Sequence, residues 1–100
     1  MKYKIVSIKH SGRKGIRGTD VNEPKYDGMI NSIVEINSSL KNEKIRYTPL
    51  YMDFIETESI YDNFHTSAIL AISINKNWNY VVETINTLYE LEEIKEDAES

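Results

Sequence analysis

Apolar and polar residues alternate along much of the chain, and this alternation predicts a sheet protein. The clearest stretch is 66–75, whose period of two is typical of a strand with one buried face. Three more strands are expected at 3–10, 29–37 and 45–57. The last of these should bend at Pro49, because proline cannot donate a hydrogen bond to a neighbouring strand. Within 66–75 the alternation sets Ala68, Leu70, Ile72 and Ile74 against Ser67, Ile69, Ala71, Ser73 and Asn75.

The segment 78–94 fits either strands or a helix. Its apolar residues recur at helical spacing, and Asn77 stands where it would cap the first turn. Against a helix, the segment is rich in β-branched residues, which lose side-chain freedom there, and its acids crowd the C-terminal end, where they oppose the helix dipole. The fold class is therefore mostly β if the segment forms strands, and α+β if it forms a C-terminal helix.

Composition strengthens the prediction of a sheet. The 100 residues include 14 Ile, 5 Val, 6 Thr and 7 Tyr, which favour strands, whereas Ala and Leu, which favour helices, total only 8. A chain of this length forms one domain, which we place at 1–94, followed by an acidic tail at 95–100 that should fray. Cys is absent, which excludes disulfides and thiolate chemistry.

The sequence shows neither a membrane-spanning segment nor a signal peptide. No stretch approaches the roughly 18 apolar residues that a membrane helix needs. The chain begins with a short strand-like segment that lacks the apolar core of a signal peptide. We therefore expect a cytoplasmic protein whose partners do not include a membrane.

Charge is distributed unevenly along a chain whose net charge is −4. Residues 1–18 carry six basic side chains and no acid, whereas 83–100 carry seven acids and the single base Lys95. A chain of this kind either folds its basic end onto its acidic end or presents two faces of opposite sign.

A long loop is expected at 11–28, because this stretch holds all four glycines of the chain together with Pro24. Glycines let backbone N–H groups approach an anion, and the neighbouring bases supply charge. Gly12 and Gly15 match the bare Gly-x-x-Gly of RNA-binding KH domains, although a strand precedes them here rather than a helix. The alternatives are a mobile, solvated hairpin loop and a loop that docks onto an acidic protein. The predicted anion or nucleic-acid contacts are Lys9, Arg13, Lys14 and Arg17.

Aromatic and acidic side chains are the predicted contacts for a protein partner. Trp78 lies in a predicted turn, where burial is hardest to arrange, and Tyr47 and Tyr51 should share one strand face. The acids near the C-terminus are either a solubilising run or a row of carboxylates that imitates phosphates in the basic groove of another protein. The acids chosen as partner contacts are Glu90, Glu92 and Glu93.

Signals for catalysis are weak. Asp62, His65 and Ser67 are close in sequence, but a catalytic triad is defined by geometry and not by adjacent letters. Asp20 and Asp27 are a second pair that a hydrolase or nuclease would use. Two histidines without tight spacing to acids do not indicate a metal site. We expect neither an enzyme nor a cofactor, and a hydrolase is the weakest of three hypotheses.

Two stretches, 65–72 and 82–92, resemble the closing strands of small SH3-like barrels from phages and mobile elements of Gram-positive bacteria. Those proteins often show Thr-Ser before a strand and a Thr-x-Asn-Thr-x-Tyr run near their end, which correspond here to Thr66-Ser67 and to 84–89. The resemblance covers the last third of the chain and implies a partly open five-stranded barrel without any particular activity. The long basic loop and the acidic tail depart from it.

The sequence as a whole predicts one small mostly-β domain that works by binding. Our first hypothesis is an interaction module encoded by a phage or mobile element, with a protein partner from host or virus. In that role it would inhibit a host nucleic-acid-handling enzyme, as anti-CRISPR or anti-restriction proteins do. The second hypothesis is direct nucleic-acid binding through the basic glycine loop at 9–18. The sequence does not indicate an oligomeric state.

Overall fold

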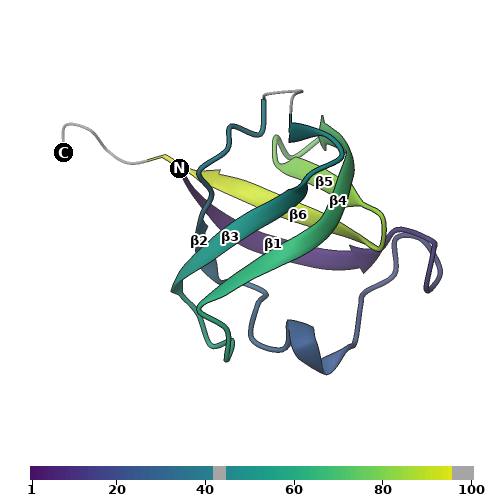
Figure 1. The fold of residues 1–100 in the computed structure, drawn as a ribbon, viewed down its shortest axis with the longest axis horizontal. Coiled ribbons are helices and arrows are strands. Elements are labelled where there is room, and N and C mark those ends of the chain that lie inside the picture. The colour runs from purple at the N-terminus through teal and green to yellow at the C-terminus, as the bar shows by residue number, and fades with distance from the viewer. Residues whose placement is uncertain (42–44, 96–100) are drawn as a thin grey trace.

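In the part of the chain that the structure describes, six antiparallel strands follow one another around a closed barrel, and the last strand pairs with the first (Figure 1). The computed structural model describes residues 1–41 and 45–95. One short 3-10 helix, η1 (Pro24–Tyr26), lies in the connection between the first two strands. The strands are β1 (Lys2–His10), β2 (Ile33–Glu35), β3 (Pro49–Glu56), β4 (Asn63–Ile74), β5 (Tyr80–Thr84) and β6 (Thr87–Ile94).

The prediction of a mostly-β fold is confirmed, and the segment 78–94 forms strands. β5 and β6 are separated only by Ile85 and Asn86, and buried residues alternate with less buried ones in both. The helical spacing of this segment is thus coincidental, since its buried residues follow a period of two that is interrupted once at the turn. The alternative of a C-terminal helix is wrong. The expected five strands in a partly open barrel are also wrong, because this segment supplies two strands and β6 closes the barrel on β1.

Side chains from all six strands fill the barrel interior, and two connections cover its ends. The ring of Tyr26, beside η1, meets that of Phe64 edge-on with 5.9 Å between centroids, where β4 begins. Leu40 is buried at the other end, near Tyr80. The buried apolar residues on the strands are Tyr3, Ile5, Ile8, Val34, Leu50, Met52, Ile69, Tyr80, Val82, Tyr89 and Leu91.

Two tyrosine hydroxyls inside the barrel are kept neutral by their surroundings. Desolvation raises the pKa of Tyr3 to about 12, and the nearby charge of Glu93 adds to the effect. Burial also raises the pKa of Tyr89 far above its usual value. Both rings therefore pack in the core, and their hydroxyls stay protonated to a higher pH than that of an exposed tyrosine.

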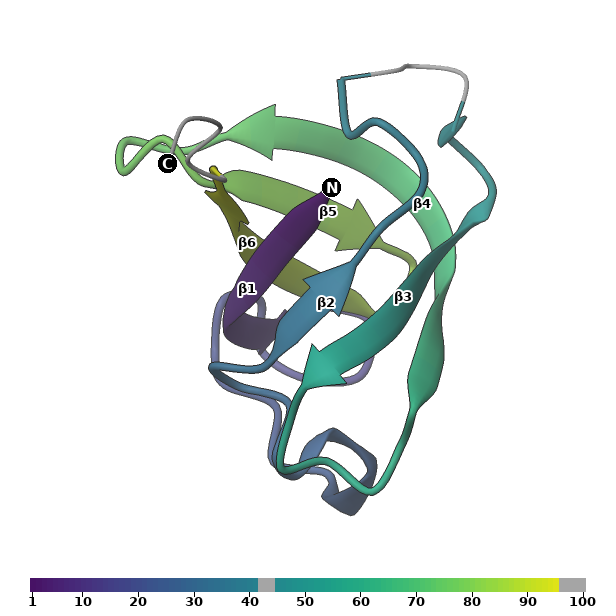
Figure 2. The same ribbon diagram turned by 90° about the vertical axis from the view of Figure 1, so that its left-hand side faces the viewer.

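β4 changes its partner along its length. Up to Ala68 it pairs with β3, and from Ile69 to Ile74 it pairs with β5. A bulge between Ile69 and Ala71 interrupts the register, so the strict alternation expected for this segment is not kept. Ile69 is fully buried, while Leu70 is 38% exposed. Figure 2 shows β4 curving past the end of β3, which leaves its second half at the rim of the barrel.

The strand expected at 29–37 is much shorter than predicted, because β2 spans only Ile33–Glu35. Met29 and Ile36 are still buried, but they lie in irregular segments on either side of the strand. Ile30 is exposed rather than on the same buried face as Val34. Of the acidic tail 95–100, only Lys95 belongs to the described residues.

Candidate functional site

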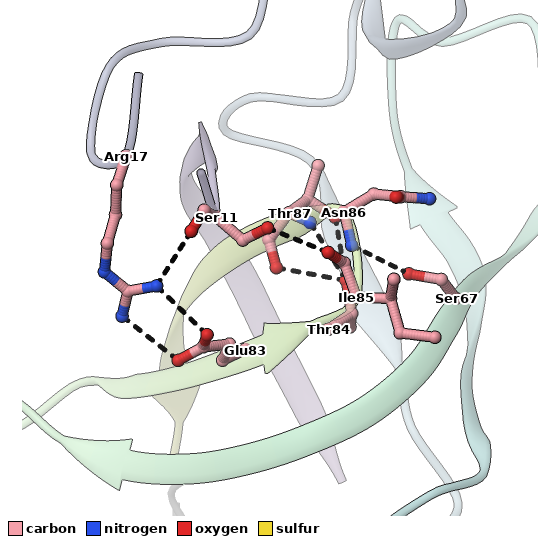
Figure 3. Close-up of polar contacts among 8 residues, drawn as sticks. All are labelled: Ser11, Arg17, Ser67, Glu83, Thr84, Ile85, Asn86 and Thr87. Carbon is pink, nitrogen blue, oxygen red and sulfur yellow. Dashed lines mark hydrogen bonds and ion pairs between the residues drawn. The ribbon is translucent and has the colours of Figure 1, made fainter. Parts of the chain in front are cut away.

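The loop after β1 folds back as a hairpin on the end of that strand. The N–H of His10 donates to the carbonyl of Thr19, with 2.8 Å between N and O, and the His10 carbonyl accepts the N–H of Gly18 at 2.9 Å. Residues 11–17 form the tip of the hairpin. Figure 3 shows two residues of this tip, Ser11 against the turn between β5 and β6 and Arg17 against Glu83 of β5.

Arg17 is held by an acid of the barrel wall. Its Nη1 and Nη2 donate to Oε2 and Oε1 of Glu83 at 3.0 and 3.1 Å, and Nη1 also donates to the Ser11 carbonyl at 2.9 Å (Figure 3). These hydrogen bonds lower the pKa of the Glu83 carboxyl. Ser11 Oγ in turn donates to the Ile85 carbonyl at 2.9 Å. Arg17, which the sequence suggests as an anion contact, instead fastens the loop to β5.

The residues that carry the resemblance to SH3-like barrels form the β5–β6 turn and its support. Thr84 Oγ1 accepts the N–H of Thr87 at 3.2 Å and donates to the Thr87 carbonyl at 3.0 Å. The N–H of Asn86 donates to Ser67 Oγ at 3.3 Å. Thr66 Oγ1 accepts the N–H of Leu50 at 2.9 Å. The motif therefore has a structural role here, which is to tie the turn to β4 and β4 to β3.

The other three predicted anion contacts differ in their surroundings. Lys9 is half-buried on β1, and its charge helps to lower the pKa of Glu90. Arg13 and Lys14 are exposed at the loop tip, without a hydrogen bond or ion pair to any residue in the described part of the chain. A Cβ on Gly15 would lie 2.7 Å from the His10 ring, so this glycine is needed for close packing of the loop on an imidazole. Of these three residues, Arg13 and Lys14 are the two that are exposed.

Glu90, predicted to contact a partner, is engaged within the molecule. Its Oε2 accepts hydrogen bonds from the side-chain amides of Asn75 and Asn79, both at 2.9 Å, and its Oε1 accepts one from Ser7 Oγ at 3.3 Å. The bond from Asn79 is the largest cause of the lowered pKa of Glu90. Glu90 thus fastens the turn between β4 and β5 to β6.

Trp78 projects from that turn, as the sequence predicts. The Oδ1 of Asn75 accepts the N–H groups of Asn77 and Asn79 at 2.9 and 3.1 Å, and the Asn75 carbonyl accepts the N–H of Trp78 at 3.0 Å. Trp78 has a φ of 64° and is 84% exposed. The role of Asn75 and Asn79 was missed in the sequence, although asparagines on both sides of a turn are a recognisable signal for such caps. The turn holds the indole in solvent.

Tyr47 and Tyr51 do not share a strand face, because Tyr47 precedes β3. Tyr47 has a φ of 69° and is 69% exposed, and the guanidinium of Arg46 lies over its ring, 5.2 Å from the centroid. Its N–H donates to the Ile69 carbonyl of β4. Tyr51 lies on β3, is 66% exposed and is in contact with the ring of His65, with 5.8 Å between centroids. Tyr47 is therefore near the second half of β4, and Tyr51 near the first.

The remaining predicted acids lie on β6 beside β1. Lys4 Nζ is 3.8 Å from Glu92 Oε1, and Glu93 is opposite Tyr3 in the register. Together with the pair of Arg17 and Glu83, this pairing supports the first interpretation of the uneven charge, in which the basic end folds onto the acidic end. Glu92 is exposed and Glu93 half-buried.

The residues suggested for hydrolysis do not assemble. His65 is exposed beside Tyr51, and no hydrogen bond joins it to Asp62 or Ser67 within residues 1–41 and 45–95. Asp20 forms a backbone bridge with Lys9. Asp27 ends η1. The described residues also contain no cluster of three or more His, Asp or Glu side chains that would hold a metal ion.

An open hollow of about 370 Å³ lies at the barrel end where β4 passes β3. One wall is formed by four consecutive residues of β4, and the other by the connection between β2 and β3, including its bases Lys41 and Arg46. The lining residues are Leu40, Lys41, Arg46, Ala71, Ile72, Ser73, Ile74 and Tyr80.

Comparisons of the chain with protein families, curated proteins and solved structures gave no match. None of the helical residues in the described ranges belongs to a helix long and apolar enough to cross a bilayer.

Proposed function

We propose that the protein is a small non-enzymatic binding domain, and that it contacts a partner protein through Trp78 and the barrel end from which Trp78 projects. The observation that carries this proposal is the conformation of Trp78. Its indole is 84% exposed and its φ is positive. The turn around it is fixed because Asn75 Oδ1 accepts the N–H of Asn77 and the side-chain amide of Asn75 donates to Glu90.

This arrangement does not serve the stability of the barrel. The left-handed region costs a residue with a side chain roughly 1–2 kcal/mol relative to the usual helical region, and glycine would occupy it without strain. An exposed indole also leaves a large apolar surface in water. Tryptophan is among the residues that contribute most to protein interfaces, and a side chain held in place before binding loses less entropy when a partner is bound.

A second exposed aromatic residue stands at the same end of the barrel. The backbone N–H of Tyr47 donates to the Ile69 carbonyl, where the second half of β4 begins. Trp78 lies in the turn that follows the end of β4 at Ile74, so the two aromatic residues flank the second half of this strand. At about 3.3 Å per residue, the five steps from Ile69 to Ile74 cover about 17 Å. One partner surface of ordinary size reaches both side chains.

Photo-crosslinking tests the proposal. A photoreactive amino acid in place of Trp78 should crosslink one predominant protein in the cells where the chain naturally occurs. The matched control is the same amino acid at Ile60, which is 90% exposed in the connection at the opposite end of β4. Added wild-type protein should compete with the crosslink, and Trp78→Ala should compete about tenfold less well. The same crosslinked products at both positions, or equal competition by Trp78→Ala, would contradict the proposal.

Nucleic-acid binding is the second candidate function. It is favoured by Arg13 and Lys14, which stand on a loop tip that Arg17 fixes to the barrel. Affinity for DNA or RNA should then fall steeply with salt and be lost in Arg13→Glu with Lys14→Glu. Absence of binding at about 50 mM salt removes this candidate.

The origin and the host process stay predictions. An SH3-like barrel from a phage or mobile element, acting as an anti-CRISPR-like or anti-restriction-like inhibitor, is consistent with a domain that presents aromatic side chains and lacks an assembled catalytic triad in its described residues. Identification of the protein crosslinked at position 78 tests this more specific hypothesis.

A further inference from the structure

The second half of β4 has one edge without a strand partner. β3 pairs with β4 only as far as Ala68, and beyond that point the N–H of Tyr47 and the carbonyl of Thr48 still bond to Ile69. From Leu70 to Ile74, no residue in the described part of the chain forms a backbone hydrogen bond to the side of β4 that faces away from β5. In Figure 2 this half of the strand runs along the rim with β5 on one side.

The direction of the unpaired groups follows from the hairpin between β4 and β5. The N–H of Asn75 donates to the Asn79 carbonyl at 3.0 Å, so Asn75 faces β5. In an antiparallel pair the residues alternate between bonded and non-bonded positions. Ile74, opposite Tyr80, and Ile72, opposite Val82, are therefore at non-bonded positions, and their N–H and carbonyl groups point away from β5. Their spacing of two residues is the repeat with which another strand pairs.

This edge lacks the features that usually prevent pairing with other chains. Exposed edges are commonly protected by charged residues, proline or a bulge along their length. The residues from Leu70 to Ile74 include no charge and no proline, and their bulge precedes Ala71. The outward side chains of Ala71 and Ser73 are small and leave the backbone accessible.

The hollow of about 370 Å³ runs along the same edge. Successive side chains of a strand point to opposite faces, so a hollow lined by all four residues from 71 to 74 meets the strand edge-on. Both charged residues of its lining, Lys41 and Arg46, are basic, although the whole chain has a net charge of −4. The apolar side chains of Leu40, Ile72 and Ile74 form its remaining sides with Tyr80.

We propose that the edge of β4 at Ile72 and Ile74 binds an extended acidic segment of the partner protein as an additional strand. The proposal rests on the proposed function and names the kind of partner segment. The backbone of the segment pairs with Ile72 and Ile74, its apolar side chains enter the hollow, and its carboxylates approach Lys41 and Arg46. Trp78 and Tyr47 contact the segment where it leaves the edge.

Charge favours such a segment over a second copy of this chain. Pairing the same edge of two copies would bring two pairs of Lys41 and Arg46 to one interface, where like charges repel. An acidic segment neutralises these charges instead. Its negative charge also speeds its approach to the basic rim, and this effect weakens as salt is added.

A peptide selection tests the proposal. Random ten-residue peptides would be selected on the full chain, and a selected peptide would be titrated while the fluorescence of Trp78, the single tryptophan, is recorded. We expect enrichment of Asp and Glu, a change in Trp78 emission, and slower amide hydrogen exchange at Ile72 and Ile74 in the complex. The double variant Lys41→Glu with Arg46→Glu should bind the peptide at least about tenfold more weakly.

Two further variants supply a control on the loop and a direct test of the strand edge. Arg13→Glu with Lys14→Glu makes the same change in net charge on the loop at the other end of β5, and its affinity should stay within about twofold of wild type. Ile74→Pro removes one outward N–H without removing a bond to β5, so it should weaken binding while the circular dichroism spectrum is unchanged.

Several outcomes would overturn the proposal. These are selected peptides without acidic enrichment, unchanged exchange at Ile72 and Ile74, or an equal loss of affinity in the loop variant. A concentration-dependent dimer with the same protected amides would identify a second copy as the occupant. Tighter peptide binding by a chain that ends at Lys95 would identify its own acidic end. If crosslinking from position 78 succeeds while these amides stay unprotected, the proposed function stands and the strand pairing fails.

Discussion

Glu90 on β6 accepts a hydrogen bond from the side-chain amide of Asn79, with 2.9 Å between Nδ2 and Oε2. This bond ties the turn that carries Trp78 to the barrel wall. A charged acceptor makes such a bond shorter and stronger than a neutral one. Glu90 therefore determines how firmly Trp78 is held, although its sequence context in an acidic run suggests a free surface acid.

Neutralising Glu90 should loosen the turn. In Glu90→Gln we expect the free energy of unfolding to fall by about 1–2 kcal/mol, because bonds to a charged acceptor are replaced by weaker ones. The fluorescence anisotropy of Trp78 should fall as well, since the indole moves more freely. The control is Glu92→Gln. Because the Glu92 carboxylate is exposed, this substitution should lower the free energy of unfolding by less than about 0.5 kcal/mol. Equal losses in both variants would show that the turn is not held by Glu90.

The stability contributed by Glu90 should depend on pH in a defined direction. The unfolded carboxyl has a pKa near 4.5, and the hydrogen bond from Asn79 lowers the pKa in the folded protein. As the pH falls below about 5, the unfolded chain binds protons first, so this contribution decreases until the pH passes below the folded pKa. Urea unfolding should therefore show a smaller difference between wild type and Glu90→Gln at about pH 3 than at about pH 7. A difference that does not change with pH would contradict this linkage.

Replacing Trp78 by glycine should stabilise the fold. Glycine adopts the positive φ of this position without strain, and we expect a gain of about 0.5–1 kcal/mol after its greater freedom in the unfolded chain is subtracted. Trp78→Ala keeps a Cβ and should change stability by less than about 0.5 kcal/mol. Circular dichroism in urea is the measurement, because both variants lack the tryptophan signal. A loss of more than about 1 kcal/mol in both would mean that the indole packs on the barrel.

The fold class and the exposed turn are predictable from the sequence because they depend on local patterns. Period-two alternation and β-branched composition indicate the sheet, and the cluster of asparagines around Trp78 indicates a turn. The bulge at Ile69 is not predictable in this way. It depends on how β4 leaves β3 for β5, which is a property of the closed barrel and not of nearby residues.

The hydrogen-bond and ion-pair partners of the charged residues are also not predictable from the sequence. Arg17 and Glu83 are brought together only when the loop after β1 folds against β5, and Glu90 meets Asn75 only through the pairing around the barrel. From residue type alone, Arg17 and Glu90 are predicted to contact a ligand or partner. Among the described residues, Arg13 and Lys14 are the two predicted anion contacts that are exposed without an ion pair, because they occupy the tip of a hairpin whose base is fastened.

Amide hydrogen exchange in the unbound protein should reveal the open edge of β4. Ala71 and Ser73 are at bonded positions of the β4–β5 pair and should exchange slowly, whereas Ile72 and Ile74 should exchange at least about tenfold faster. The central residues of β6, such as Tyr89, serve as the reference, because they have strands on both sides. Residue-resolved NMR exchange measures all of these amides in one sample. Uniformly slow exchange from 71 to 74 would show that this edge is already covered and would remove the basis for an added strand.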